Sequence, residues 1–571
     1  MRHSCEHVLT QVMLKLWPKI KMAMGPATED GFYFDLDPGD LKLSEADFPK
    51  IEAEMAKIIK ENLPIRKKTL TVAEARKLFK NNPYKQEWLN GIKAKRQKPT
   101  VYWTGKEFVD LCAGPHVSST GKIGAFKLLS IAGAYWHGSE KNKMLTRIYG
   151  TCFPTQKELD QYLWLQEEAK KRDHRKIGKE QELFLSSQDV GPGLPIFLPR
   201  GFIIRDLLEK YIMEEKKKRG YLFVWTPHIT RSSLYQKSGH WQKYDAMFNP
   251  MKLDDEDYVL KPMNCPHHFQ IYLERPRSYR ELPLRIAENA TVYRYEKSGE
   301  IGGLLRVRSL TQDDTHTFLR KEQIPEEIDR ILDLTETVYR VFSFKDYRAR
   351  ISTRDPKNKQ KYLGSDKIWQ LAEKSLITAA KKRKLNYFLG HGEAAFYGPK
   401  IDVLMKDSLG REWQLTTVQL DFNQPENFQM VYTNEKGEQE RPAILHIAIL
   451  GTLERFLGIL IEHLGGAFPV WLSPIQTQVI PVADRHLDYA RKVAKIIKDQ
   501  DIRVELKDEQ ETVSKKIRNG ELQKIPYLLV VGDREMRAKN VAVRQRKKGD
   551  LGQMKLEDFI DKVKKEIKEK K

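Results

Sequence analysis

Two pairs of chemically capable side chains stand early in the sequence, each with four-residue spacing. His3 and His7 fall in a segment with helical character, so both project from one helix face. Cys112 and His116 belong to the segment DLCAGPH, where glycine and proline predict a turn. Such a set is typical either of a four-ligand zinc site or of a cluster for acid-base and nucleophilic chemistry. Both alternatives stay open, but the matched spacing favours a functional site over four unrelated structural residues.

A second set combines one cysteine with two histidines far apart in the sequence. Cys265 lies in KPMNCPHH, His316 in TQDDTH and His446 in LHIAILG. One thiolate and two imidazoles can hold zinc and leave a coordination position open for a substrate. The gaps are long, so spacing alone is weak support, and His267 and His268 are competing ligands.

The charge balance indicates a polyanionic partner. The chain has 571 residues, with 100 Lys and Arg against 78 Asp and Glu, a formal charge of +22. Excess positive charge attracts nucleic acid, although a lysine-rich solvated surface is the alternative explanation. The four cysteines are too few and too scattered for a disulfide framework. The sequence has neither a signal peptide nor an apolar run long enough to span a membrane, so we expect a cytoplasmic protein.

The first two of four predicted segments are an α+β domain and a connector. Residues 1–155 mix an opening helix (5–16) with short strands and turns, which predicts an α+β domain. Residues 156–181 carry few apolar side chains among many charges, which predicts a solvated linker helix.

The other two segments differ in their rhythm of elements. Residues 182–474 contain apolar, β-branched runs separated by charged helical stretches, which predicts a large antiparallel sheet flanked by helices. Residues 475–571 alternate strand and helix, which predicts a small doubly wound α/β domain.

Three segments of the long third region resemble the motifs of class II aminoacyl-tRNA synthetases. Residues 294–296 (RYE) with 305–308 (LRVR) resemble motif 2, residues 451–456 (GTLERF) resemble motif 3, and the segment from residue 201 resembles motif 1. Arginines suit a nucleotide because their planar guanidinium groups pair bidentately with phosphate oxygens.

Within that class the chain resembles the threonyl-tRNA synthetases of bacterial type. The matching segments are MNCP, TQDDxH, FYGPK, WQxxTVQLDF, the N-terminal HxxxH with CxGPH, AYW, KML, RIYG and the linker KRDHRK. They run over essentially the whole chain. The chain begins at the editing helix, so we expect it to lack the family's small ubiquitin-like N-terminal domain.

This resemblance implies an enzyme, a threonine–tRNA ligase, with an expected fold. The domains are an α+β editing domain (1–155), a linker helix (156–181), a class II catalytic domain with an antiparallel sheet (182–474) and an α/β anticodon-binding domain (475–571). The reaction activates threonine with ATP and Mg²⁺, transfers it to the 3′ end of tRNA(Thr), and hydrolyses mischarged seryl-tRNA at a separate site. One Zn²⁺ per chain and a homodimer are also implied.

The resemblance further assigns residues to the aminoacylation site. Arg294 falls on the α-phosphate, Arg455 on the γ-phosphate end, and Arg306 and Glu296 beside the nucleotide. Zinc at Cys265, His316 and His446 would bind the amino and hydroxyl groups of threonine, with Asp314 as an acceptor. The remaining lining residues are Gln312, Tyr397, Lys400, Gln414, Thr417 and Gln419.

A pocket of this kind has an asymmetric specificity. Valine leaves a metal position and an acceptor unpaired and is strongly rejected. Serine lacks only a methyl group, worth about 1–3 kcal/mol, so it enters. An editing site is therefore required.

The editing and anticodon sites are assigned in the same way. The editing cluster would be His3, His7, Cys112 and His116 with Asp110 and Lys85, working without metal through a histidine that activates water. The tRNA contacts in the last domain would be Glu535, Arg544 and Arg546, for which an exposed charged hairpin is the alternative explanation.

The sequence departs from the family pattern at five positions. Ala113 replaces an arginine of the editing loop, Ser309 and Leu310 replace Gly-Phe before TQDD, Ile447 replaces an arginine after the zinc histidine, and Thr416 replaces a glycine. No departure falls on a proposed zinc ligand.

Two other functions are alternatives to this one. A seryl- or prolyl-type synthetase would lack the Cys/His/His set and the front-end cluster. A non-enzymatic RNA-binding regulator derived from a synthetase would not need Arg294, Glu296, Arg455 and the three ligand candidates, all of which are present.

Overall fold

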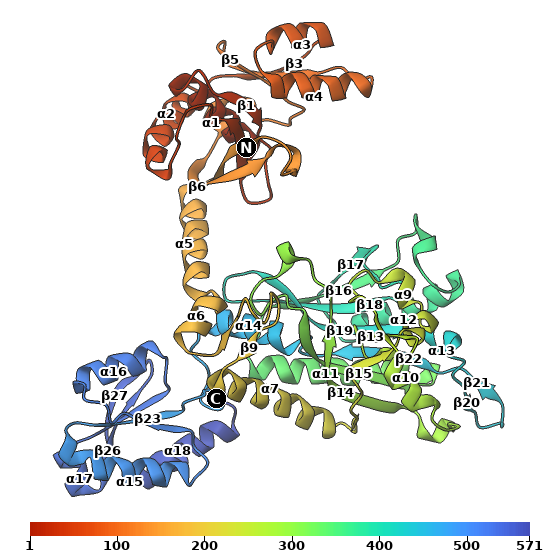
Figure 1. The fold of residues 1–571 in the computed structure, drawn as a ribbon, viewed down its shortest axis with the longest axis vertical. Helices are drawn as coiled ribbons and strands as arrows, with labels where there is room; N and C mark the ends of the chain where they lie inside the picture. The colour runs from red at the N-terminus through yellow and green to blue at the C-terminus, as the bar shows by residue number, and fades with distance from the viewer. The chain divides into compact units, whose positions relative to one another are not determined.

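The computed structural model describes residues 1–571 and separates into two compact units, Met1–Glu167 and Glu168–Lys571 (Figure 1). The division falls inside helix α5 (Gln156–Arg172), and α6 (His174–Glu180) follows it directly. Where the sequence predicts one linker helix, there are thus two, because Asp173 interrupts the first and caps the second by accepting from the Arg175 N–H at 2.8 Å. None of the helices combines the length and apolar character needed to cross a bilayer.

The N-terminal unit is an α+β structure built on two antiparallel sheets. Its elements are α1 (Arg2–Leu16), β1 (Lys21–Met24), β2 (Phe32–Asp37), α2 (Phe48–Lys60), β3 (Ile65–Thr69), α3 (Val72–Leu78), α4 (Pro83–Ala94), β4 (Thr100–Thr104), β5 (Phe108–Leu111), β6 (Ala125–Tyr135) and β7 (Met144–Phe153). The larger sheet has the order β1-β2-β7-β6 and the smaller one β3-β4-β5. Helix α1 packs with α2 and β2 and buries Val8, Leu9 and Val12 in this core. The mixed α+β character predicted for this region is confirmed.

The second unit is organised around one eight-stranded sheet (Figure 1). Its strands, in spatial order, are β10 (Leu222–Phe223), β14 (Leu284–Tyr293), β15 (Ser309–Leu319), β22 (Ala443–Ala448), β19 (Glu412–Asp421), β18 (Lys400–Lys406), β16 (Tyr347–Thr353) and β17 (Tyr387–His391). The six inner strands are antiparallel, and the two edge strands pair in parallel with their neighbours. The large antiparallel sheet predicted from the apolar runs is confirmed.

Helices and short strands complete this region. They are β8 (Phe184–Leu185), β9 (Ile196–Phe197), α7 (Pro199–Lys217), β11 (Ile229–Arg231), α8 (Ser232–Lys237), α9 (His240–Lys243), β12 (Met251–Leu253), β13 (Glu256–Leu260), α10 (Cys265–Leu273), α11 (Ile324–Val341), α12 (Asp366–Lys382), α13 (Gln424–Asn427), β20 (Tyr432–Thr433), β21 (Gln439–Glu440) and α14 (Leu453–Leu464). Side chains of α7, α11, α12 and α14 share one apolar cluster with side chains of the sheet. With this face of the sheet covered, the other is available for a site.

The C-terminal part of this unit has its own mixed sheet. Its elements are β23 (Thr477–Pro481), α15 (Leu487–Lys498), β24 (Val504–Leu506), α16 (Val513–Leu522), β25 (Tyr527–Val531), α17 (Asp533–Ala538), β26 (Asn540–Gln545), β27 (Gly549–Lys555) and α18 (Leu556–Lys568). Strands β24, β23 and β25 are parallel, as the predicted alternation of strand and helix requires. Beyond that alternation, β26 and β27 extend the sheet as an antiparallel hairpin.

Candidate functional site

Three neighbouring strands place polar side chains on one face of the eight-stranded sheet. On β15 the alternation of a strand puts Gln312, Asp314 and His316 on the same side. His446 on β22 lies directly opposite His316, and Gln419 on β19 lies opposite His446. Register alone therefore gathers residues that are up to 134 positions apart in the sequence.

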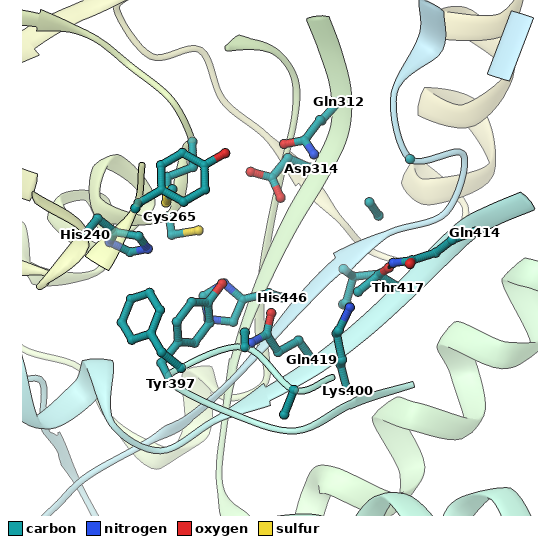
Figure 2. A pocket seen from close by; sticks show the side chains of 18 of the residues that line it. His240, Cys265, Gln312, Asp314, Tyr397, Lys400, Gln414, Thr417, Gln419 and His446 are labelled. Atoms are coloured by element: carbon teal, nitrogen blue, oxygen red, sulfur yellow. The ribbon is translucent and has the colours of Figure 1, made fainter. Parts of the chain in front are cut away.

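A cavity of about 750 Å³ opens over this face (Figure 2). Its lining includes nearly all of the residues assigned to the aminoacylation site from the sequence: Cys265, Arg294, Gln312, Asp314, Tyr397, Lys400, Gln414, Thr417, Gln419, His446 and Arg455. His316 lies beneath it, with no solvent exposure.

The cysteine and two histidines predicted as zinc ligands converge. One donor atom from each of Cys265, His316 and His446 lies within 4.8 Å of the others, and all three residues are buried. His316 Nε2 and His446 Nδ1 have no hydrogen-bond partner, although both are buried. Buried polar atoms rarely go unpaired, so an arrangement that leaves two of them unpaired beside a thiol fits a bound cation.

The other nitrogen of each histidine is held by a neighbour. His446 Nε2 lies 3.0 Å from Asp421 Oδ2, and His316 Nδ1 lies 2.8 Å from His268 Nδ1. Metal-binding histidines are commonly oriented in this way through their second nitrogen. Of the competing ligands, His268 bonds a ligand candidate instead of joining the set, and His267 is not among the converging donors.

Burial controls the protonation of the surrounding groups. Burial, and then the nearby Asp314 and Asp421, raise the pKa of the Cys265 thiol well above its usual range. Burial also raises the pKa of Asp314 and that of Tyr397, so the Tyr397 phenol stays neutral. A cation placed here would offset the repulsion between thiolate and carboxylates.

Asp402 organises the opposite side of the cavity. It is fully buried on β18, where its carboxylate accepts from Gln414 Nε2 at 2.7 Å and Thr417 Oγ1 at 3.0 Å and pairs with Lys400 Nζ at 2.8 Å. Arg350 Nη2 also lies 3.0 Å from it. Asp402 was not predicted as a site residue because a lone aspartate in a strand has no sequence signature.

Arginine side chains line the part of the cavity assigned to the nucleotide. Neither Arg294 nor Arg455 is paired with a carboxylate, and the Arg455 Nε is buried without a partner. Burial, and then the charge of Arg306, lower the pKa of Arg455. Arg306 and Glu296 lie outside the lining and pair with each other at 2.8 Å. Open guanidinium donors suit phosphate oxygens.

Another lining residue, His240 on α9, was also missed from sequence. Its side chain is buried, its Nδ1 lies 2.7 Å from Ser238 Oγ, and its ring is 5.8 Å from that of Tyr397. Burial lowers the pKa of His240 to about 3, so the ring is neutral. Nothing in the sequence around it marks it as a site residue.

Three departures from the family pattern are accommodated by packing. Leu310 is buried with Val292 and Val307, and Thr416 donates to the Ile449 carbonyl at 2.7 Å. Ile447 is almost fully buried and lines the cavity. All three side chains are packed within the protein, and none of them takes part in the polar contacts described above.

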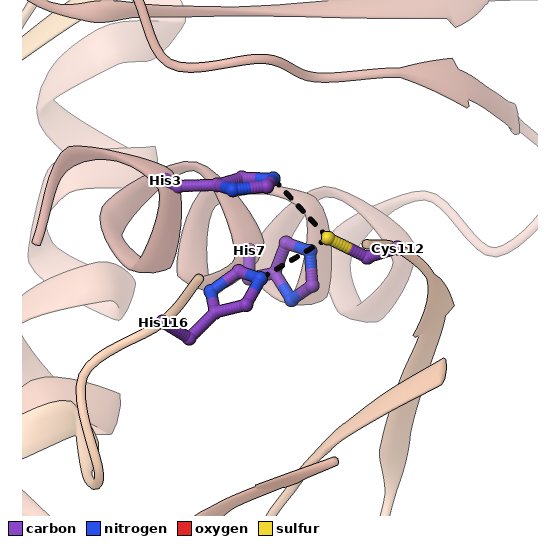
Figure 3. Close-up of side chains that lie close together, drawn as sticks. All are labelled: His3, His7, Cys112 and His116. Carbon is purple, nitrogen blue, oxygen red and sulfur yellow. Dashed lines mark hydrogen bonds between the residues drawn. The ribbon is translucent and has the colours of Figure 1, made fainter. Parts of the chain in front are cut away.

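The second predicted cluster also assembles, in the N-terminal unit (Figure 3). His3 and His7 project from α1 toward Cys112 and His116, which follow β5. Cys112 Sγ lies 3.3 Å from His3 Nε2 and 3.2 Å from His116 Nε2. Around a tetrahedral zinc ion the sulfur and nitrogen ligands would be about 3.5 Å apart without hydrogen bonds between them. One donor atom from each of the four residues lies within 4.8 Å of the others, so the geometry fits both acid-base chemistry and metal ligation.

Burial keeps this cluster uncharged. It lowers the pKa of His3, lowers that of His7 well below 6.5 and, with the charges of the other two histidines, brings that of His116 to about 2. It also raises the pKa of the Cys112 thiol to about 11. At neutral pH the rings are free bases beside a neutral thiol.

Lys85 and Asp110 form a buried ion pair at 2.6 Å and line a cavity of about 480 Å³ with His3, His7 and Cys112. The pair places one fixed cation and one fixed anion beside the histidines. Ala113, the departure in this loop, also lines the cavity.

Glu6 and Gly25 form a close contact beside this cavity that the sequence did not reveal. The Glu6 side chain is buried against Gly25, where an added Cβ would lie 1.9 Å from Glu6 Oε1. A glycine is therefore required at position 25 for this backbone to approach the carboxyl group.

The three residues predicted to contact tRNA in the C-terminal part differ in their partners within the protein. Glu535 is buried, with its carboxylate bonded to the Gly532 N–H at 2.9 Å and to Gln553 at 2.7 Å. Arg546 donates to the carbonyls of Lys524 and Phe468. Arg544 is half-exposed, with carboxylates no nearer than 3.7 Å. Glu535 and Arg546 thus have partners inside the protein that residue type alone does not reveal, and the tRNA contacts of all three residues stay a prediction.

The family models that match this chain cover its three main regions. They are the tRNA synthetase class II core domain (G, H, P, S and T) over residues 248–464, an anticodon-binding domain over 476–566, and the threonyl and alanyl tRNA synthetase second additional domain over 100–149.

Relatives match over almost the full length. Threonine–tRNA ligases of Rubrobacter xylanophilus and Carboxydothermus hydrogenoformans are each 50% identical, over 99% and 100% of this chain and 88% and 89% of their own. Among solved structures, one described as the RNA-binding domain of threonyl-tRNA synthetase from Cryptosporidium parvum is 35% identical. It covers 69% of this chain and 98% of its own, with a TM-score of 0.66. With a class II core, an anticodon-binding domain and a second additional domain in one chain, the protein belongs to the threonine–tRNA ligase family of class II aminoacyl-tRNA synthetases.

Proposed function

We propose that this ligase selects threonine with zinc held by Cys265, His316 and His446, and hydrolyses seryl-tRNA at His3, His7, Cys112 and His116. The observation that carries the first site is the pair of buried, unpartnered nitrogens, His316 Nε2 and His446 Nδ1, beside the Cys265 sulfur. The chain uses ATP and Mg²⁺, as its class II core implies.

The donor set fits zinc and leaves room for a substrate. A thiol and two imidazoles are ligands that zinc prefers, and three protein ligands are typical of sites that keep a position open. When bound, zinc would supply a Lewis acid to which the amino and hydroxyl groups of threonine can bind. Cys265 stands at the N-terminus of α10, where the helix dipole favours a thiolate.

Asp314 provides a hydrogen-bond acceptor beside the proposed zinc site. It lies two residues from His316 on the same strand face, and its side chain is buried at the cavity wall. Its carboxyl group accepts the threonine hydroxyl or amine. Valine, which has no hydroxyl, leaves this acceptor unpaired, and that loss explains its rejection.

The arginine side of the cavity holds ATP. Arg294 and Arg455 have no protein anion to neutralise them, so phosphate oxygens become their partners. Lys400, which pairs with Asp402, adds a positive charge to the lining of the cavity. These cations keep two anionic substrates together and stabilise the charge that develops when the threonine carboxylate attacks the α-phosphate.

The second cluster provides a separate hydrolytic site. Serine passes the first site because it retains the hydroxyl and lacks only a methyl group. One of the neutral imidazoles of His3, His7 and His116 accepts a proton from the water that attacks the seryl ester and returns it to the departing 3′ oxygen of the tRNA, which releases serine, while the thiol of Cys112 stays protonated. We infer that this site works without metal, since the Cys112 sulfur lies within hydrogen-bond distance of His3 Nε2 and His116 Nε2.

A homodimer is part of the proposal. Apolar side chains on α7 and around β10 are exposed, with Phe202 at 54%, Leu222 at 58% and Trp225 at 74% of their full accessibility. Such a group of large apolar side chains supports an interface with a second copy. This is the segment that resembles motif 1.

Pyrophosphate exchange dependent on the amino acid tests the first site. We expect exchange with threonine, weaker exchange with serine and almost none with valine. Cys265→Ser should abolish exchange while tRNA binding persists. Undiminished threonine exchange by Cys265→Ser would remove zinc from the function.

A further inference from the structure

His268 stands behind the proposed metal ligand His316 and is bonded through both ring nitrogens. Its Nδ1 lies 2.8 Å from His316 Nδ1, and its Nε2 lies 3.2 Å from Glu288 Oε2. The His268 side chain has no solvent exposure. Its neighbour His267 is also buried, but both of its ring nitrogens are without partners. Two adjacent histidines on α10 thus have different surroundings.

Glu288 is held as an acceptor by several donors. Its carboxylate receives the Thr226 N–H at 3.0 Å, the Thr226 hydroxyl at 2.9 Å and Asn264 Nδ2 at 2.7 Å, and Lys261 Nζ lies 3.7 Å away. A carboxylate surrounded only by donors is an ionised carboxylate. Asn264 directly precedes Cys265, so the same carboxylate also anchors the segment that carries the sulfur.

For a neutral His268, these contacts determine where the protons lie. Because Glu288 accepts, His268 Nε2 must donate, and a neutral His268 then has a bare Nδ1. The contact at 2.8 Å requires a donor, which is the His316 Nδ1–H. His316 Nε2 is consequently bare, and it is the nitrogen without a partner. On the other strand, Asp421 accepts from His446 Nε2–H and leaves His446 Nδ1 bare in the same way.

We propose that Glu288 and His268 form a positioning relay that fixes the tautomer and orientation of His316 and presents its Nε2 to the metal. This inference rests on the zinc site proposed above and assigns it two residues that touch neither metal nor substrate. A donor chain ending in a carboxylate increases the basicity of the ligand nitrogen and restrains its ring. Removing a partner of this kind typically weakens metal binding by about 10- to 100-fold.

The test is the zinc affinity of the full-length protein, measured by competition with a chromophoric chelator. His268→Phe keeps a ring of similar size but has no acceptor, and we expect its zinc affinity to fall by about 10- to 100-fold. His268→Asn keeps an acceptor near the position of Nδ1 and should recover part of the loss. Glu288→Gln removes the charge at the end of the relay and should also weaken binding. His267→Phe, on the same helix, is the matched control and should bind zinc within about twofold of the parent protein, because His267 lies outside the relay.

The outcomes separate the relay from the metal site. If the parent protein binds zinc and a folded His268→Phe binds it equally well, the relay is overturned and the zinc site stands. If the parent protein binds no zinc, the proposed site itself fails. Should His268→Phe not fold, as judged by circular dichroism and melting, Glu288→Gln carries the test, and unchanged affinity overturns the relay. Equal losses in His268→Asn, His268→Phe and His267→Phe would indicate only general packing damage, and would also overturn it.

Discussion

His316 and His446 lie directly opposite each other on the antiparallel strands β15 and β22, with ring centroids 4.7 Å apart. Opposed residues on such strands point to the same face, so register alone brings the two rings together. Cys265 reaches the same place from the start of α10. A shift of one residue in the pairing would turn one ring to the other side of the sheet and dismantle the site.

Asp314→Asn should weaken the recognition of threonine. The substitution keeps the size of the side chain but removes a charged acceptor, and hydrogen bonds to charged groups contribute about 1.5–3 kcal/mol. We expect kcat/KM for threonine in pyrophosphate exchange to fall by about 10- to 100-fold, while the KM for ATP changes little. An unchanged kcat/KM for threonine would exclude Asp314 from substrate binding.

Asp402→Asn should lower both activity and stability. Two cations depend on this buried carboxylate, and breaking a buried pair by removing one partner typically costs about 3–5 kcal/mol. The comparison is Arg348→Gln on the same strand as Arg350, which breaks the exposed pair with Glu412 and should cost at most about 1 kcal/mol. Thermal melting and pyrophosphate exchange measure both effects. Equal behaviour of the two variants would show that Asp402 does not organise the cavity floor.

His3→Ala combined with His7→Ala should separate the two activities. Threonine charging should persist because the cluster belongs to the N-terminal unit, whereas the residues that line the cavity of the eight-stranded sheet all belong to the second unit. Seryl-tRNA should accumulate, since the side chains that activate water are gone. The measurement is the release of labelled serine from preformed seryl-tRNA. Rapid release by the double variant would assign editing to other residues.

Editing should be insensitive to pH between about 8 and 6. Burial places the pKa of His7 well below 6.5 and, with the charges of the other two histidines, brings that of His116 to about 2, so these two rings remain free bases over this range. A histidine with an ordinary pKa would retain only about a quarter of its free base at pH 6. In the unfolded chain these histidines take up protons below about pH 6.5. The stability of this unit therefore decreases as the pH is lowered below that value. An enzymatic hydrolysis rate that declines with a midpoint near 6.5 would contradict this assignment.

The sequence was sufficient to predict the main sheets and to name most of the side chains that line the central cavity. Strand alternation places Gln312, Asp314 and His316 on one face, and four-residue spacing places His3 and His7 on one face of α1. The large antiparallel sheet follows from its apolar runs, and the family follows from short motifs now supported by full-length relatives.

The sequence did not predict the contacts that depend on the register between distant strands. Asp402 is important because it bonds Gln414 across paired strands and pairs with Lys400 on its own strand. No local sequence pattern predicts these contacts. His268 was a competing ligand in the sequence and is instead a neighbour of His316, a distinction that only the direction of its ring decides. Glu535 has a residue type suited to RNA bases but is bonded within the protein.

The central claim is that a metal held by Cys265, His316 and His446 recognises the hydroxyl of the amino acid. The most direct test is the visible absorption spectrum of the protein with cobalt in place of zinc, recorded as amino acids are added. Threonine and serine should change the cobalt bands and valine should not, and Cys265→Ser should lack the sulfur-to-cobalt charge-transfer band. A spectrum that threonine leaves unchanged, or that valine changes equally, would contradict the account.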